Sequence, residues 1–115
     1  MSIIGEIKDS ISGAYKLASY LKKIRLSRKE EELLISALPD GKIQLFLLNE
    51  GNFIRAGNKN FPDDKTSDPA EFEKYFEALK RLEQRGDVRH ETGILYMLTA
   101  SGFKKAKKLE RKKQR

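Results

Sequence analysis

The sequence predicts an α+β fold in which amphipathic helices alternate with antiparallel β-hairpins. Two observations predict this class. The apolar residues change from a helical spacing to short alternating or continuous runs at residue 42 and again at residue 88. Strong capping and turn signals separate these segments. The chain has 115 residues, a length typical of one domain that buries a core without a metal or disulfide.

Residues 3–25 are predicted to form a long amphipathic helix, so the chain divides into this N-terminal helix (1–26) and a domain (27–115). The apolar residues follow alternating spacings of three and four, as in one seam of a coiled coil. They are Ile4, Ile7, Ile11, Ala14, Ala18 and Leu21. The seam fits either packing on the chain's own core or pairing with a second copy to form a homodimer. It lacks Trp and Phe, which disfavours attachment to a membrane surface.

A second helix is predicted to begin after Ser27, because Ser27 and Glu30 have the spacing of a capping box. Its apolar face consists of Leu33, Leu34, Ala37 and Leu38, and the turn formers Pro39, Asp40 and Gly41 end it. Two apolar runs, 43–48 and 53–56, then flank an Asn- and Gly-containing turn and predict a hairpin. Residues 56–68 are predicted to be a loop anchored by Phe61.

The helix 69–85 has the clearest signals. Asp68 is a suitable N-cap, Pro69 suits the first helical turn, and Gly86 suits the left-handed position after the last turn. A second hairpin follows, in which Val88, Ile94, Tyr96 and Leu98 are expected to pack on the preceding helix. Thr99 is expected to cap a last, basic helix that extends to about Lys112.

The net charge of +7 is concentrated at the C-terminal end of the sequence. Residues 101–115 hold eight Lys or Arg and one acid, Glu110, whereas residues 1–100 are neutral overall. Such a segment fits an electrostatic arm for nucleic acid or for an anionic membrane, and it equally fits a solubilising terminus. No secretory signal and no apolar run of roughly 18–20 residues is present, so we expect a cytoplasmic protein.

The segment "AEFEKYFEALKRLEQRGDVRHETGILYMLTASGFKKA" combines a helix, a short hairpin and a "Y.LT..G" motif at the start of the next helix. This pattern resembles the winged helix-turn-helix superfamily. Together with "GKIQLFLLNEGNFIRAGNKNF" it is similar to an uncharacterised group of small bacterial winged-helix proteins with an extra hairpin. The resemblance covers roughly residues 28–109 and implies a winged-helix-like domain. Members of the superfamily include transcription regulators and modules that bind only protein.

Two features depart from a DNA-reading winged helix. Only one clear helix, 69–85, lies between the first hairpin and the predicted wing, so the positioning helix is missing or reduced to residues 61–67. The exposed face of helix 69–85 begins with Glu73 and Glu77, which would repel phosphates. We therefore expect contacts mainly to the DNA backbone rather than to base edges.

The sequence thus predicts a DNA-binding protein or, alternatively, a protein–protein interaction module that keeps the fold without base reading. The candidates for backbone contact are Arg28, Lys29, Lys80, Arg81, Arg85, Arg89, Lys104, Lys105, Lys107 and Lys108. Peripheral membrane attachment is a third, less favoured alternative. With no Cys and a single His, typical catalytic triads and zinc sites lack their components. We expect no enzymatic activity, no catalytic residue, no metal or other cofactor and no small-molecule substrate.

Overall fold

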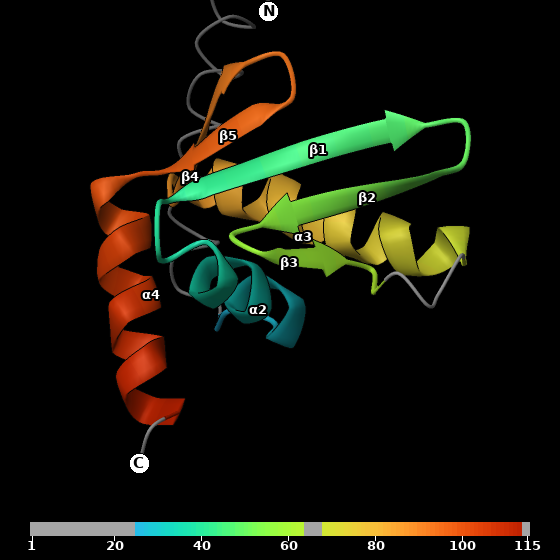
Figure 1. Ribbon diagram of the computed structural model, residues 1–115. Helices are drawn as coiled ribbons and strands as arrows, with labels where there is room; N and C mark the ends of the chain where they lie inside the picture. Colours follow the sequence, from blue (N-terminus) through green and yellow to red (C-terminus); the bar gives the residue numbers. More distant parts are fainter. Residues whose placement is uncertain (1–24, 64–67, 114–115) are drawn as a thin grey trace, which may run out of the picture.

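Three helices and one five-stranded antiparallel sheet make up the part of the chain that the computed structural model describes, residues 25–63 and 68–113 (Figure 1). In chain order the elements are α2 (Arg28–Ser36), β1 (Lys42–Leu48), β2 (Gly51–Ala56), β3 (Lys59–Phe61), α3 (Pro69–Arg85), β4 (Val88–Thr92), β5 (Leu95–Leu98) and α4 (Ala100–Lys113). The α+β class predicted from the sequence is confirmed. The predicted N-terminal helix and its apolar seam lie almost entirely outside the described residues.

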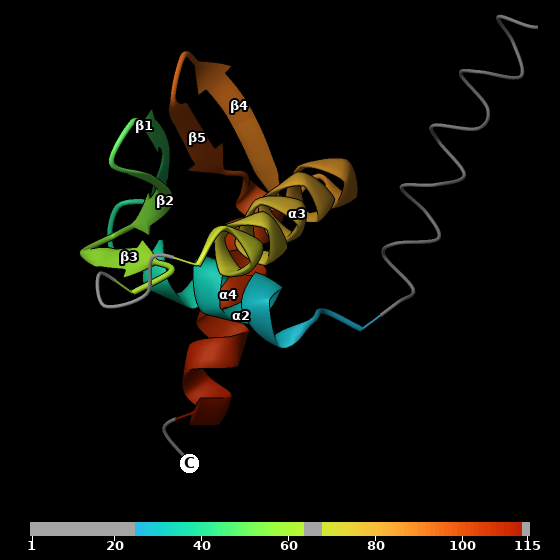
Figure 2. The ribbon, with the colours of Figure 1, turned by 90° about the vertical axis from the view of Figure 1, so that its right-hand side faces the viewer.

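The strand order is β3-β2-β1-β5-β4, so two hairpin systems that are distant in sequence join at the centre of the sheet. The joining pair is β1 and β5, in which Ile43 lies opposite Tyr96. Helix α3 connects the two edge strands β3 and β4, and Figure 1 shows it crossing behind the sheet. Figure 2 shows β1, β2 and β3 on one side of α3, with no helix of the described residues on their opposite side.

Local signals account for the helix boundaries. The backbone N–H of Glu30 donates to Ser27 Oγ (3.2 Å), and that of Ala70 donates to Asp68 Oδ1 (3.0 Å). Gly86 follows α3 in the left-handed region (φ 84°), where glycine is favoured. The predicted bounds of α3 are therefore confirmed, as are both hairpins.

The core lies between the sheet and the helices. It contains Leu33, Leu34 and Ala37 from α2 and its end, Ile43, Leu45, Ile54, Ala56 and Phe61 from the sheet, and Phe72, Leu79 and Leu82 from α3. Val88, Leu98 and Ala106 extend it toward α4. The apolar face predicted for α2 and the anchoring role predicted for Phe61 are confirmed.

Two expectations about this region are wrong. Residues 56–68 are not all loop, because Lys59–Phe61 pairs with β2 as an edge strand. Ile94 is not part of the core: it lies in the β4–β5 turn and is 46% exposed. Val88 and Leu98, at the other end of the hairpin, do pack inward, so only the tip of this hairpin departs from the expected pattern.

Candidate nucleic-acid interface

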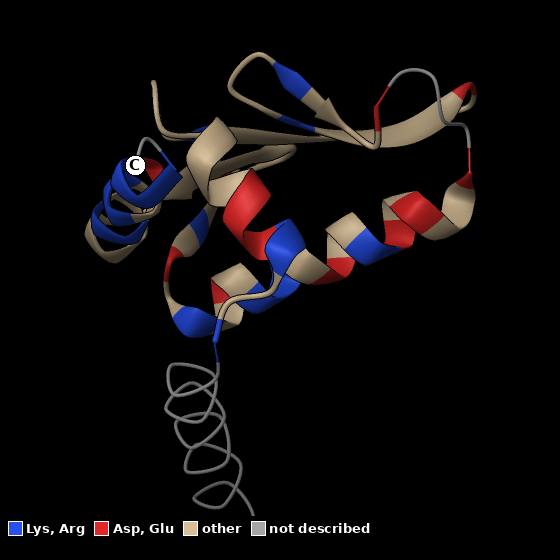
Figure 3. Ribbon diagram, turned by 90° about the horizontal axis from the view of Figure 1, so that it is seen from below, with Lys and Arg blue, Asp and Glu red and all other residues tan. Residues whose placement is uncertain are grey.

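Helix α4 presents a continuous row of positive side chains to solvent. The members of this cationic stripe are Lys104, Lys107, Lys108 and Arg111, all of which are exposed. With 3.6 residues per turn, their spacing places them within an arc of about 100° on one side of the helix. The opposite side carries the buried residues Gly102 and Ala106. Figure 3 shows how densely the basic residues cover α4 compared with the mixed charges of α3.

The start of α4 is fixed by hydrogen bonds to the end of α3. Thr99 Oγ1 accepts from the backbone N–H of Gly102 (3.2 Å) and donates to the carbonyl of Gly86 (2.6 Å). The buried carboxylate of Asp87 accepts from Ser101 Oγ (2.7 Å) and from Lys105 Nζ (2.8 Å). These bonds hold the cationic stripe in a defined orientation relative to the sheet.

The same contacts separate Lys105 from the stripe. Its ammonium forms an ion pair with Asp87, and its side chain is only 33% exposed. Lys105 was a predicted phosphate contact, and the structure instead places it in the contact between α4 and the end of α3. Lys104, Lys107 and Lys108, the other candidates on α4, lie together on its exposed side.

An aromatic side chain links the stripe to the first strand. The ring of Phe103 lies against Gly41, where any Cβ would overlap the ring. Phe103 also lines an open depression of about 580 Å³ with Ala100, Lys104, Lys107 and Arg111. The base of the stripe therefore adjoins Lys42, the exposed first residue of β1.

The predicted cations of α2 and α3 are dispersed. Arg28 is exposed at the start of α2, whereas Lys29 lies 4.7 Å from the centroid of the Tyr75 ring and 3.8 Å from a carboxylate oxygen of Glu71. Lys80 lies 4.9 Å from the centroid of the Phe76 ring, and Arg81 is exposed beside it. None of these four joins the cationic stripe of α4.

The structure places Arg85 inside the domain and not on its surface. The sequence suggested a phosphate contact, but the side chain is 3% exposed, and its Nε lies 2.9 Å from Oε2 of Glu30, which is 2% exposed. A guanidinium enclosed in this way cannot reach a nucleic acid. Glu30 itself does not complete the capping box that its position predicts, because its carboxylate turns inward to this ion pair.

The hairpin β4–β5 carries Arg89 on its exposed surface. Arg89 Nε donates to Glu91 Oε1 (2.8 Å), and the Arg89 guanidinium also forms an ion pair with this carboxylate, so its charge is partly compensated. His90 Nε2 donates to the carbonyl of Gly93 (2.8 Å), and its ring packs beside Tyr96 with the centroids 4.6 Å apart. His90 therefore stabilises the turn.

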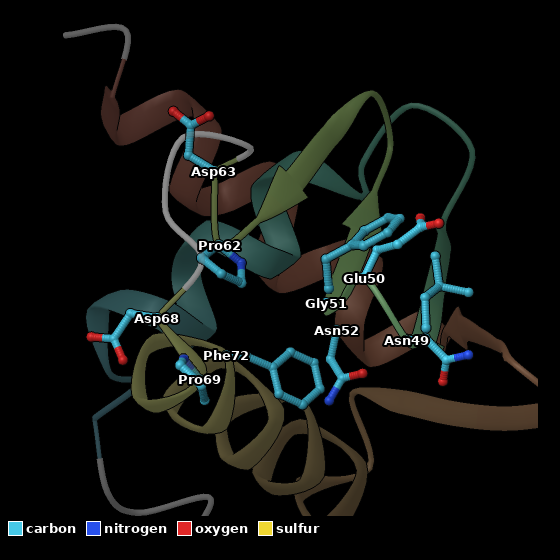
Figure 4. Close-up of a pocket in the computed structure, with 11 residues that line it drawn as sticks. Asn49, Glu50, Gly51, Asn52, Pro62, Asp63, Asp68, Pro69 and Phe72 are labelled. Carbon is cyan, nitrogen blue, oxygen red and sulfur yellow. The ribbon is translucent and has the colours of Figure 1, made fainter.

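A cleft of about 400 Å³ lies between the β1–β2 turn and the start of α3. Figure 4 shows the ring of Phe72 and the side chain of Asn52 facing each other there, while the carboxylates of Asp63 and Asp68 point away. Asp68 is already used as the N-cap of α3. The cleft thus lacks converging polar groups of the kind that orient a small ligand.

The described residues contain no group of three or more His, Asp or Glu side chains arranged to hold a metal ion. No helix among them combines the length and apolar character needed to cross a bilayer.

Comparison with known proteins finds no matching family model, no matching curated protein and no matching solved structure.

Sequence reasoning did not single out several exposed cations, among them Arg111, Lys42 and Arg55. Arg111 was recognised as part of the basic tail but not as a stripe member, although its i+3, i+4 and i+7 spacings from Lys108, Lys107 and Lys104 carry that signal. Lys42 and Arg55 lie on strands whose exposed side depends on where the helices pack. No local pattern identifies that side.

Proposed function

We propose that this protein binds DNA and that it does so mainly through the phosphate backbone. The cationic stripe of α4 carries the proposal, because four exposed cations lie on one side of a helix whose single acid, Glu110, lies outside that arc. Such an array releases counterions when it meets phosphates, and this effect supplies most sequence-independent affinity. The bonds of Thr99 and Asp87 favour binding by keeping the array fixed.

We further propose that the domain is a variant winged helix. The order of α2, the strands, α3 and the β4–β5 hairpin supports this relation, as does the central pairing of β1 with β5. In this proposal β4–β5 is the wing and α3 takes the place of the recognition helix. The exposed Glu73 and Glu77 in the first half of α3 argue against base reading by that helix.

We also propose that the protein is cytoplasmic and has no catalytic activity. Two copies would pair through the N-terminal seam. A dimer would present two copies of the cationic stripe to one duplex and so increase the number of phosphate contacts.

A salt titration of binding to a random-sequence duplex tests the DNA proposal. We expect binding at about 50 mM salt, and a log–log slope that decreases by about 1.8 in magnitude in the Lys107→Gln/Arg111→Gln variant, since each lost phosphate contact removes about 0.9. Fluorescence anisotropy of a labelled duplex measures both quantities.

Lys59→Gln/Lys74→Gln is the matched control. Both lysines are exposed and lie on β3 and α3, so this variant loses the same net charge without touching α4. Its slope should equal that of the unmodified protein. Absence of binding at low salt, or equal slopes for the two double variants, would contradict the proposal.

A second candidate function is binding of a protein partner at the end of the β1–β2 hairpin. Leu47 and Leu48 are 63% and 46% exposed there, and exposed large apolar side chains that adjoin one another favour protein contacts. If a protein partner binds this hairpin, Leu47→Ser/Leu48→Ser should abolish its binding while Lys107→Gln/Arg111→Gln leaves it unchanged.

A further inference from the structure

One whole face of the sheet is uncovered by any helix of the described chain. Residues alternate along each strand, so Ile43, Leu45 and Ile54 point to the core while their neighbours point to the other side. This open face consists of Lys42, Gln44, Phe46 and Leu48 on β1, Gly51, Phe53 and Arg55 on β2, Asn60 on β3, Leu95 and Met97 on β5, and Arg89 and Thr92 on β4, with Glu91 at the register shift between them and paired with Arg89. None of these residues is buried.

Two aromatic rings lie side by side on the β1–β2 hairpin, one residue pair beyond Ile54, where the pairing of β2 with β3 ends. Phe46 and Phe53 are directly opposite each other on β1 and β2, with ring centroids 4.8 Å apart and planes inclined by 22°. Both are partly exposed. They are a paired aromatic surface of the kind on which nucleic-acid bases stack.

Polar side chains frame the ring pair. The guanidinium carbon of Arg55 lies 5.6 Å from the centroid of Phe46 and 5.8 Å from that of Phe53. Arg55 Nε donates to Asn60 Oδ1 (3.0 Å), which holds the arginine beside the rings, and Gln44 lies opposite Arg55 on β1. A guanidinium and amide groups next to aromatic rings can contact phosphates and base edges together.

The charge of the face matches a nucleic acid. It carries Lys42, Arg55 and Arg89 against one acid, Glu91, which is already paired with Arg89. Lys42 also adjoins the base of the cationic stripe through the contact of Phe103 with Gly41. From Lys42 to Phe46 the strand rises about 13 Å, which is about the length of four stacked nucleotides.

We propose that the open face of the sheet binds a single-stranded nucleic acid, with bases stacking on Phe46 and Phe53 and the backbone continuing toward Lys42 and the cationic stripe. This inference rests on the proposed nucleic-acid binding by α4 and adds a preference for single strands. A duplex keeps its bases stacked inside and cannot use the rings.

The test compares a labelled oligothymidine of about 12 nucleotides, within the site sizes of roughly 4–16 known for such surfaces, with a duplex of equal length. Full-length protein should bind the single strand more tightly than the duplex. Phe53→Leu should weaken single-strand binding about tenfold, the loss expected for one stacking contact, and leave duplex binding unchanged.

Phe76→Leu is the matched control, because Phe76 is also partly exposed, stacks on Phe72 and has a cation, Lys80, beside its ring, but lies on α3. It should not change single-strand affinity. Phe53→Trp provides a second readout that does not rely on removing the ring. The natural chain has no Trp, so quenching of the single tryptophan in this variant by the oligothymidine reports contact at the ring pair directly.

Three results would overturn the inference. One is single-strand affinity that Phe53→Leu leaves unchanged, and another is tryptophan emission of the Phe53→Trp variant that does not respond to bound oligothymidine. The third is concentration-dependent self-association that Phe53→Leu removes while single-strand affinity stays constant, since the face would then bind a second copy. Duplex binding that persists and depends on Lys107 and Arg111 would keep the proposed function intact in each case. Absence of binding to either nucleic acid at about 50 mM salt would contradict both.

Discussion

The carboxylate of Asp87 determines how the C-terminal helix leaves the domain. It is fully buried, yet both of its oxygens are bonded, one to Ser101 and the other to Lys105. A buried carboxylate without partners would be very costly, so these two bonds make the position of α4 the favourable one. Together with the bonds of Thr99, this carboxylate therefore sets the orientation of the cationic stripe from outside the stripe.

Tyr75 provides a pH-dependent test of the contact between α2 and α3. Its hydroxyl donates to Glu32 Oε2 (2.8 Å). Burial, followed by the hydrogen bond and charge of Glu32 and the charge of Glu71, raises the pKa of Tyr75 from 10.0 to about 12. Folding thus favours the neutral phenol. Its contribution is fully present below pH 10 and is lost as the pH rises toward 12.

We predict that Tyr75→Phe lowers the free energy of unfolding by about 1 kcal/mol at neutral pH, because one hydrogen bond to a carboxylate is removed. The difference from the unmodified protein should shrink between pH 10 and 12. Urea unfolding across this range measures it. The pKa of Tyr96 is also raised, by burial and then by Glu83, but Tyr96 is present in both proteins and cancels in the difference. A difference that is constant with pH would contradict the assigned hydrogen bond.

The ion pair of Glu30 and Arg85 joins α2 to the last turn of α3. Both side chains are almost completely enclosed, so each charge depends on the other for compensation. Removing one partner leaves an uncompensated buried charge, which typically costs about 3–5 kcal/mol, whereas removing both does not.

We therefore predict that Arg85→Met lowers the free energy of unfolding by about 3–5 kcal/mol and that Glu30→Met/Arg85→Met recovers most of this loss. Urea unfolding monitored by circular dichroism gives both values. The pair of Glu71 and Lys74, 3.1 Å apart and with the lysine side chain 59% exposed, is the control, because Lys74→Met should cost less than about 1 kcal/mol. A double variant as unstable as Arg85→Met would show that the pair does not act as a unit.

The elements differ in how well their sequences predict them. The bounds of α3 are predictable because Asp68, Pro69 and Gly86 act within one turn of each helix end. Strand β3 is not, because three residues, Lys59–Phe61, become a strand only when β2 lies alongside.

The residues of the candidate site differ in the same way. The lysines of α4 could be identified from spacing alone, since their neighbours in space are neighbours in sequence. The burial of Arg85 could not, because its partner Glu30 lies far away in the chain. The open face of the sheet could not be identified from the sequence either, because the alternation of Phe46 with Leu45 does not reveal which side the helices cover.

For the whole molecule, charge is distributed unevenly. Basic residues crowd α4, whereas the cleft at the far end of β1 and β2 has three carboxylates around it, Glu50, Asp63 and Asp68. If the protein binds a nucleic acid as proposed, we expect the first encounter at the basic end of the described domain, which favours one mode of approach.

The predicted N-terminal seam adds an expectation about assembly. If it pairs two copies, Ile7→Glu/Ile11→Glu should halve the mass measured by light scattering, because two acids replace apolar residues of the seam. Ser12→Glu, on the predicted polar side of the same helix, is the control and should leave the mass unchanged. An equal mass for all three proteins would contradict dimerisation through the seam.

The pairing of β1 with β5 has a consequence for the speed of folding. Each hairpin forms from neighbouring residues, but Ile43 meets Tyr96 only after the hairpins and α3, which separate the two residues in the chain, reach their final arrangement. Contacts that close such long stretches of chain must overcome a large entropy before they contribute stability, and they slow folding. We therefore expect the centre of the sheet to assemble after the local hairpins, which would make the β1–β5 pairing the slow step of folding.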